Sequence, residues 1–193
     1  FVIKSSRSGY GIATYSRFPI VNKGEIKFKN TSNACIYSDI KVEDDTIRVY
    51  NCHLQSLRLK ERNLNFLINQ DHQGESNTVD ELKDISFKFR DALIKRAHQV
   101  NMITSSVSSC KYPVIICGDF NDSPFSYTYH ELTRNLFDTF KEAGKGLANT
   151  YVRFFPYRID YILHSRNIKA ISFSSPRVDY SDHYPVICSY YIE

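Results

Sequence analysis

Four apolar, strand-like segments of this sequence end in polar or ionisable residues, and this pattern constrains the fold more than any other feature. In the sharpest case the apolar run Val114–Cys117 leads directly into GDFNDSP, residues 118–124. A tight turn needs one or two polar residues with Gly or Pro, so two carboxylates and an amide exceed that need. The four polar segments are NCHLQS (51–56), GDFND (118–122), RIDYI (158–162) and SDHYPV (181–186). Because α/β folds place functional sites in loops beyond strand ends, we expect these segments to contribute to one site.

Alternating apolar residues predict a β-hairpin in the first third of the chain. Its strands are expected at 34–42 and 46–54, with Ile36, Ile40 and Ile47 facing inward around the turn Glu43-Asp44-Asp45. Further strands are predicted from β-branched and aromatic content. They are expected at 11–15, 112–117, 157–164 and 186–192.

Helical periodicity predicts one long amphipathic helix over Val79–Ser105. Its apolar face is formed by Leu82, Ile85, Phe89, Ala92, Val100 and Ile103. Thr78 and Glu81 have the spacing of a capping box at its start. A short helix is expected at 127–135. The polar segment 57–77 is either a substrate-facing loop or a mobile insertion, and we favour the mobile insertion. This alternation of strands and helices is typical of an α/β or layered α+β domain.

Composition sets broad limits on the class of protein. The chain has 193 residues and a net charge of +4, which suits an anionic partner without requiring one. Its five cysteines have no CxxC or Cys/His spacing for zinc, so buried thiols are the expected state. No run of about 18 apolar residues exists, so we expect no membrane span within the chain. The first residue is Phe1 rather than Met, and we expect a piece of a longer protein. Compartment and oligomeric state are left open.

The polar residues of the four segments match the needs of phosphoester hydrolysis. Carboxylates can hold a divalent cation that neutralises phosphate oxygens. A His kept in one tautomer by an Asp can position and deprotonate a water molecule. An Asn amide can orient phosphate or water without adding negative charge. The set therefore contains the residue types of a catalytic site.

Together the motifs resemble the endonuclease/exonuclease/phosphatase family. This family of metal-dependent phosphodiesterases includes deoxyribonuclease I, apurinic endonucleases, neutral sphingomyelinases, deadenylases and inositol polyphosphate 5-phosphatases. The matching elements follow one another along the chain. They are Gly11–Ile20 (GIATYSRFPI, with slightly different spacing), Asn51–Leu54 (NCHL), Gly118–Asn121 (GDFN), Arg158–Ile162 (RIDYI) and Ser181–Val186 (SDHYPV).

The resemblance implies a role for each matching residue. Asp119 would orient or activate the attacking water, and Asn121 would help to bind the phosphate. His183 would contact the phosphate as general base or as a stabiliser of the transition state, and Asp160 would hold His183 by a hydrogen bond. Which group is the base is left open. Asp122 is expected to shape the turn before Pro124.

The resemblance also implies a cofactor and a substrate side. The cofactor would be Mg²⁺ or Mn²⁺, with Asp182 at the metal. His53 would contact the phosphate on the leaving-group side. Apart from the resemblance, charge alone makes Arg58 a candidate for binding an anionic substrate, together with Lys4, Arg7, Lys60 and Arg62, although scattered basic residues usually form a solvated face. A phosphoester is the expected partner, with nucleic acid as one candidate.

The family resemblance implies a four-layer α/β sandwich, in which two mixed β-sheets pack face to face with helices outside. It also implies an earlier strand bearing Asn and a later one ending in Gln-Glu, whose Glu is the principal magnesium ligand. Neither is visible in this sequence. We therefore interpret residues 1–193 as a single domain that lacks the first strands of the family domain.

Several alternatives are left open. The chain can be a catalytically silent binding module of the same fold, or a structural α/β domain. The hydrolase itself can be a nuclease or a phospholipid or phosphoinositide phosphoesterase. The His53 and His183 pair resembles the deoxyribonuclease, sphingomyelinase and deadenylase branches more than the apurinic endonucleases.

Overall fold

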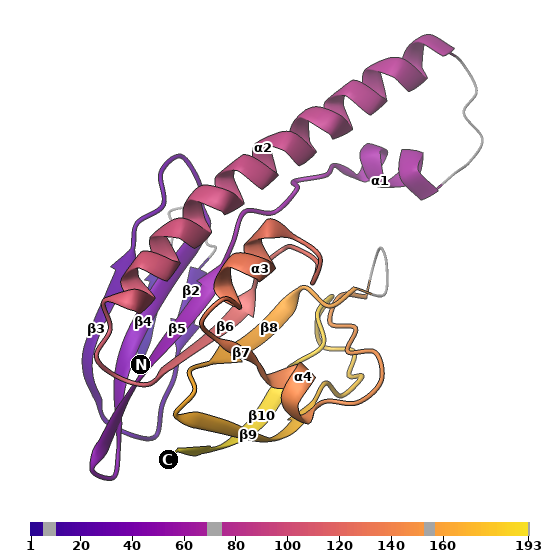
Figure 1. The fold of residues 1–193 in the computed structure, drawn as a ribbon. Helices are drawn as coiled ribbons and strands as arrows, with labels where there is room; N and C mark the ends of the chain where they lie inside the picture. Colours follow the sequence, from indigo (N-terminus) through magenta and orange to yellow (C-terminus); the bar gives the residue numbers. More distant parts are fainter. Residues whose placement is uncertain (6–10, 69–74, 153–156, 193) are drawn as a thin grey trace.

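A six-stranded mixed β-sheet forms the centre of the computed structural model, which describes residues 1–5, 11–68, 75–152 and 157–192 (Figure 1). The strand order is β3-β4-β5-β6-β8-β7. Strands β5 and β6 run parallel, whereas the other described pairs in this sheet are antiparallel. The strands are β3 (Ile20–Ile26), β4 (Ala34–Val42), β5 (Asp45–His53), β6 (Val114–Asp119), β7 (Phe137–Asp138) and β8 (Asp160–His164).

The predicted hairpin is confirmed as β4 and β5, with Ile36, Ile40 and Ile47 buried. The sequence did not predict β3 and β7. Both lie at the edges of the sheet, where a strand has one neighbour and needs less apolar character. Strand β3 reads IVNKGEI, and its Val21, Asn22 and Lys23 are exposed.

The parallel pair β5 and β6 is joined by a helical crossover, as parallel neighbours require. The crossover consists of α1 (Glu61–Ile68) and α2 (Glu75–Ser108). Helix α2 has 34 residues and is therefore about 51 Å long. Its N-terminal part extends beyond the sheet beside α1, as Figure 1 shows. The shorter helices are α3 (Tyr127–Leu132) and α4 (Thr139–Ala143).

The crossover corrects two sequence predictions. Part of the predicted mobile segment 57–77 is helical as α1, while residues 69–74 lie outside the described residues. Helix α2 begins at Glu75, so Thr78 lies inside it and the capping-box prediction is wrong. Glu81 instead accepts a hydrogen bond from buried Asn63 of α1. Lys88 also donates to Asn63 at 2.6 Å, so polar contacts hold α1 against α2.

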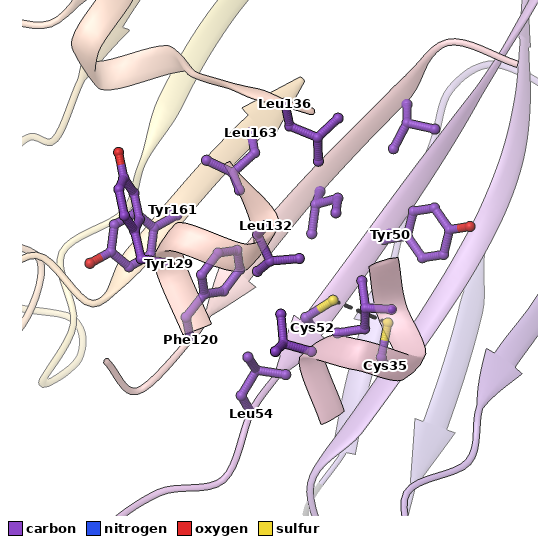
Figure 2. Packing of buried hydrophobic residues seen from close by; sticks show 14 residues of the cluster. Cys35, Tyr50, Cys52, Leu54, Phe120, Tyr129, Leu132, Leu136, Tyr161 and Leu163 are labelled. Carbon is purple, nitrogen blue, oxygen red and sulfur yellow. Dashed lines mark hydrogen bonds between the residues drawn. The ribbon is translucent and has the colours of Figure 1, made fainter. Parts of the chain in front are cut away.

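The core lies between the sheet and one face of α2 and α3 (Figure 2). Cys35, Cys52 and Leu54 from the sheet belong to the same buried cluster as Val100 and Ile103 from α2. Full burial of an aliphatic side chain stabilises a fold by about 1.5–3 kcal/mol, so these contacts account for the docking of the helix.

Two residues of the predicted apolar face of α2 are not buried. Leu82 is 48% exposed and Phe89 is 42% exposed, whereas Ile85 and Ala92 are buried as expected. Arg96 occupies the position between Ala92 and Val100 on the buried face, at 2% exposure of its side chain.

Two further sheets of two strands each lie on the opposite face of the central sheet. They are β1 (Val2–Ser5) with β2 (Gly11–Thr14), and β9 (Ile168–Ser174) with β10 (Ile187–Ile192). Side chains alternate across a strand, so Asn51 points away from the core residue Cys52. Its amide donates to the carbonyl oxygen of Ala13 at 2.8 Å. His164 points to the same face and lies 5.5 Å from the ring of Tyr190.

The predicted layered α/β sandwich is confirmed, with α2 and α3 on one side of the central sheet and the smaller sheets, together with the short helix α4, on the other. Strand β9 was not predicted, although its sequence IKAISFS alternates. The single-domain interpretation stays a prediction. None of the helices in the described part of the chain is long and apolar enough to cross a membrane.

A buried ion pair joins β7 to the segment that precedes β8. Arg158 donates two hydrogen bonds to Asp138, at 2.8 and 2.6 Å. The carboxylate also accepts from Tyr129 Oη at 2.7 Å and from the backbone N–H of Phe140 at 2.9 Å. Burial is the largest influence on Asp138 and would raise its pKa, but the hydrogen bonds and charge of Arg158, together with the hydrogen bonds from Tyr129 and Phe140, outweigh burial and hold this pKa below its ordinary value.

We expect Asp138→Asn to lower the free energy of unfolding by about 3–5 kcal/mol at pH 7, because Arg158 is left buried without its partner charge. A depressed carboxyl pKa stabilises the fold above the unfolded-state pKa, near 3.9, and this contribution is lost as pH falls through the folded-state value. The effect should therefore shrink below about pH 4. Urea unfolding at several pH values measures it.

The matched control is Asp44→Asn in the exposed turn between β4 and β5. It should change the free energy of unfolding by less than about 0.5 kcal/mol. Equal losses for both variants would contradict the assigned importance of the buried pair.

Candidate active site

Three of the predicted site residues lie in one line across neighbouring strands. In the register of the sheet, His53 of β5 pairs with Asp119 of β6, and Asp119 pairs with Asp160 of β8. The parallel strands β5 and β6 end at the same edge, and the antiparallel β8 begins there. By alternation, His53 and Asp119 point to the face occupied by the small sheets, as Asn51 and Cys117 do. The strand pairing therefore brings together residues that are more than 100 positions apart.

The turn after β6 fixes the orientation of Asp119. Asn121 has a φ of 52°, a left-handed conformation that Asn tolerates better than most residues. Its backbone N–H donates to Asp119 Oδ1 at 2.7 Å, and its side-chain amide donates to Oδ2 at 2.8 Å. The same amide nitrogen donates to the carbonyl oxygen of Leu54 at 3.1 Å. Asn121 therefore holds the Asp119 carboxylate and ties the ends of β5 and β6 together.

Gly118 makes this turn possible. Its φ is 137°, and a Cβ atom at this position would lie 1.9 Å from the carbonyl oxygen of Cys52. The close approach of the two strand ends therefore excludes any side chain at position 118.

His183 reaches the site from the loop before β10. Its Nδ1 lies 2.8 Å from Asp160 Oδ2, as predicted. The hydrogen bond from Nδ1–H to this carboxylate selects the tautomer in which Nε2 has a free lone pair. The bond also raises the pKa of His183 above its ordinary value, more than partial burial lowers it.

Burial is the main cause of the pKa shifts of Asp119 and His53. Burial raises the pKa of Asp119 to about 7, with a further contribution from the negative charge of Asp160. Burial lowers the pKa of His53, and the nearby charge of His183 lowers it further. His53 Nε2 lies 3.7 Å from Asp119 Oδ2, which is longer than a hydrogen bond. The site thus holds two groups, Asp119 and His183, whose proton affinities are raised.

The remaining predicted residues lie around this centre. Asp182 is exposed next to His183, and Ser181 Oγ donates to its Oδ1 at 3.3 Å. Arg58 lines a cavity of about 920 Å³ together with His53 and Lys4. Arg58 also has a left-handed backbone conformation, with a φ of 50°. The structure therefore places His53 and Arg58 along one cavity beside the line of strand-end residues.

Asp122 and Arg158 do not belong to the site. Asp122 accepts hydrogen bonds from Arg96 Nε and Thr128 Oγ1, each at 2.9 Å, which agrees with its predicted role in shaping the turn. Arg158 of the RIDYI motif is engaged with buried Asp138.

Two positioning residues were missed by the sequence analysis. Arg96 of α2 binds Asp122 after β6 and also donates to the carbonyl oxygen of Gln55 after β5, at 2.8 Å. The sequence contained an indication of this role, because Arg96 interrupts the predicted apolar face of the helix between Ala92 and Val100. Thr150 is fully buried, and its Oγ1 accepts from the backbone N–H groups of Ile159 and Asp160, each at 3.1 Å. The carbonyl oxygen of Thr150 accepts a hydrogen bond from the backbone N–H of Tyr184 at 2.7 Å. Thr150 therefore holds the backbone both at Asp160 and next to His183. Nothing in the local sequence marks Thr150.

The described residues do not fit a complete metal site. Within residues 1–5, 11–68, 75–152 and 157–192, no three His, Cys, Asp or Glu side chains converge on one point. The carboxylates of Asp119 and Asp160 are engaged by Asn121 and His183. Magnesium usually needs one or two protein carboxylates besides water and substrate phosphates, and Asp182 is the candidate that is not part of these two pairs.

Comparison with known proteins identifies the class. The model of the Endonuclease/Exonuclease/phosphatase family matches residues 2–183. The chain therefore belongs to the endonuclease/exonuclease/phosphatase family, as the motifs predicted. A search of the curated proteins finds no match to this sequence.

Solved structures show the same fold at low sequence identity. The mannosyl-6-phosphatase Bt3783 of Bacteroides thetaiotaomicron has a TM-score of 0.59 and 19% identity, covering 91% of this chain and 67% of that one. The human Nocturnin catalytic domain, with bound sulfate, has a TM-score of 0.60 and 19% identity, covering 92% and 61%. D. rerio TDP2 complexed with single-strand DNA product has a TM-score of 0.59 and 15% identity, covering 91% and 69%. The chain thus spans between 61% and 69% of the length of these three structures.

The close strand approach at Gly118 predicts a large loss of stability for Gly118→Ala. A non-Gly residue with this backbone costs about 1–3 kcal/mol, and the clash with Cys52 adds to that cost. Gly146→Ala is the control, because Gly146 has a φ of 71° but no atom lies within 4 Å of the position that a Cβ would take there. Thermal unfolding should show the larger decrease in Tm for Gly118→Ala. Equal decreases would mean that the steric contact is unimportant.

The hydrogen bond from His183 to Asp160 predicts that Asp160→Asn lowers the pKa of His183, because the charged partner is lost. An NMR titration of the His183 ring resonances in buffer with EDTA measures the change. Asp179→Asn, an exposed change in the same loop, is the control and should leave the pKa of His183 close to its wild-type value. An unchanged pKa in Asp160→Asn would show that the pair does not form in solution.

Proposed function

We propose that this chain hydrolyses phosphoester bonds, with water as the nucleophile and with Mg²⁺ or Mn²⁺ as cofactor. The observation that carries the proposal is the convergence of His53, Asp119 and the Asp160–His183 pair at one edge of the central sheet. Membership of a family of phosphatases and nucleases supports it. The bond that breaks joins phosphorus to the leaving-group oxygen, and the new bond joins phosphorus to the oxygen of water.

Two groups of the site can accept the proton of the attacking water. His183 has its Nδ1 on Asp160, which leaves Nε2 as a basic atom that also becomes a donor to phosphate oxygen once protonated. Asp119 has a pKa of about 7, which suits a general base near neutral pH. In either case Asn121 keeps the Asp119 carboxylate in one orientation. The proposal assigns the activation of water to this Asp119 and His183 pair and leaves their order open.

The cavity beside His53 supports a position for the leaving group. Arg58 and Lys4 add positive charge to its lining, and Arg guanidinium groups bind phosphate oxygens through paired hydrogen bonds. Lys4 forms an ion pair with Glu25 at 2.5 Å, so Arg58 is the cation more available to an anion. In this proposal His53 and Arg58 bind the substrate on the leaving-group side.

The metal requirement rests on family membership and on Asp182. The carboxylate of Asp182 would supply one oxygen ligand, and the bound ion would neutralise phosphate charge during hydrolysis. The described residues do not complete a metal site, so the roles given above to the protein residues rest on their own contacts.

The alternative is a binding module of the same fold without turnover. The absence of three converging metal-ligand side chains within the described ranges favours this alternative. The presence of His53 and of the Asp160–His183 hydrogen bond favours the enzyme. The substrate class is also a choice between nucleic acid and a smaller phosphoester, such as a phospholipid headgroup or a phosphoinositide. A nucleic-acid substrate predicts a rate that falls steeply with salt, because phosphate contacts release counterions.

Hydrolysis of bis-p-nitrophenyl phosphate and of single-stranded DNA tests the proposal, with Mg²⁺ and then with EDTA. We expect activity that EDTA abolishes. His183→Ala and Asp119→Asn should each lower kcat by about 10²–10⁴, the usual contribution of a general base. His130→Ala, at an exposed position of α3, and Asp44→Asn are the matched controls and should retain wild-type rates.

The outcome that contradicts catalysis is a folded protein that hydrolyses no phosphoester under any of these conditions. If that protein binds phosphoesters and keeps its affinity in both site variants, the binding-module alternative replaces the enzyme. Activity that persists in His183→Ala and Asp119→Asn would contradict the assigned residues.

A further inference from the structure

A second cavity lies at the other end of the central sheet, away from the candidate active site. Its volume is about 950 Å³, and its walls come from α3, β7, α4 and the turn between β8 and β9. His164, at the end of β8, is part of the lining, whereas Asp160, at the start of β8, belongs to the active site. Four residues of β-strand separate the two positions by about 13 Å. The cavity is therefore not part of the site described above.

Positive charge dominates the lining of this cavity. Four cationic side chains contribute to it, namely Arg134, Lys141, Arg166 and Lys169. Arg166 and Lys169 are exposed, and neither has a carboxylate within 4.0 Å among the described residues. Such cations attract an anion, and a guanidinium group matches the geometry of phosphate oxygens.

The two acidic residues of the lining are already engaged. Asp138 forms the buried pair with Arg158. Glu142 Oε2 lies 2.8 Å from Nε2 of His164, which is 1% exposed. Neither carboxylate forms an ion pair with Arg166 or Lys169 among the described residues, so these two cations remain accessible to a ligand.

The cavity also has one accessible aromatic wall. Phe137 is 46% exposed and stacks on the ring of His164, with ring centroids 6.0 Å apart and planes at 24°. Tyr129, the other aromatic ring of the lining, is 1% exposed and lies under the ammonium group of Lys141, 5.0 Å away. Phe137 thus offers a flat apolar surface, held in place by His164, beside cationic side chains.

We infer that this cavity binds a phosphorylated ligand with a planar ring, of the size and chemistry of a mononucleotide, with its phosphate on Arg166 and Lys169 and its ring against Phe137. The volume lies within the range of about 300–1,000 Å³ that small-ligand sites occupy. A long single strand would need several successive aromatic platforms, and the described residues of the lining supply one accessible ring. The site is separate from the proposed hydrolytic centre and does not depend on its activity.

Isothermal titration calorimetry with adenosine 5′-monophosphate tests the inference, in buffer with EDTA so that a metal-dependent hydrolysis is suppressed. Inorganic phosphate and adenosine separate the contributions of the two parts of the ligand. We expect adenosine 5′-monophosphate to bind more tightly than either. Arg166→Glu with Lys169→Glu should weaken binding of the nucleotide at least tenfold. Phe137→Ala should weaken binding of the nucleotide and leave that of phosphate unchanged.

The control reverses two exposed charges at the opposite edge of the sheet. Lys23→Glu with Lys41→Glu makes the same change in net charge on β3 and β4, and it should alter the affinity less than twofold. His183→Ala should also leave the affinity unchanged, which separates this cavity from the active site. Circular dichroism of each variant confirms that it is folded.

Any one of several results would overturn the inference. The first is no binding of the nucleotide. The second is binding that fails the two variant tests, because it persists after Arg166→Glu with Lys169→Glu or disappears in His183→Ala. The third is binding of a single-stranded oligonucleotide through Arg166 and Lys169 without binding of the mononucleotide, which would make this a surface for nucleic acid.

Discussion

The parallel pairing of β5 with β6 determines where the polar strand ends of this chain meet. Parallel strands end at the same edge of a sheet, and the crossover of α1 and α2 is the connection that this arrangement needs. The antiparallel β8 then starts at that edge, in register with Asp119. A shift of one residue in either pairing would turn the side chain of Asp119 or Asp160 to the opposite face. The site therefore depends on strand register more than on any single side-chain contact.

Residues outside the catalytic set keep that register rigid. Arg96 contacts the ends of β5 and β6 from the buried face of α2, and Thr150 holds the backbone at Asp160 and next to His183. Buried polar groups of this kind are costly unless they are hydrogen-bonded, so they favour one arrangement of the loops over others. The carboxylate of Asp119 is held in the same way by Asn121, which also contacts Leu54 at the end of β5.

The two faces of the central sheet have different packing partners and different roles. One face packs against α2 and α3 and supplies the core around Tyr50 and Leu163, while the other meets the small sheets. The candidate active site lies at one end of that second face, and the cavity beside His164 lies near the other end. Burial raises the pKa of Asp119 at the first end, whereas exposed cations surround the second. The two sites thus differ in their electrostatics as well as in their position.

The sequence alone determined the motifs, the hairpin of β4 and β5, the long helix and the family. These features are local: apolar alternation, helical periodicity and a polar run directly after an apolar one. The hydrogen bond between Asp160 and His183 was also predicted, through the family resemblance. The sequence placed neither the helix α1 nor the edge strands β3 and β7, because weak local preferences there are decided by neighbours in space.

Only the tertiary structure decided which residues support the site. From the sequence alone, Arg96 cannot be distinguished from the other charged residues of its helix, and Thr150 resembles an ordinary loop residue. Their roles become visible only when the helix and the loop are placed against the sheet. Asn121 holds Asp119 through two hydrogen bonds, while its expected contact with phosphate stays a prediction. Glu81, expected to cap a helix, binds Asn63 of a neighbouring helix. The physical reason is the same in each case, because a polar side chain can satisfy its hydrogen bonds locally or across the fold, and packing settles the choice.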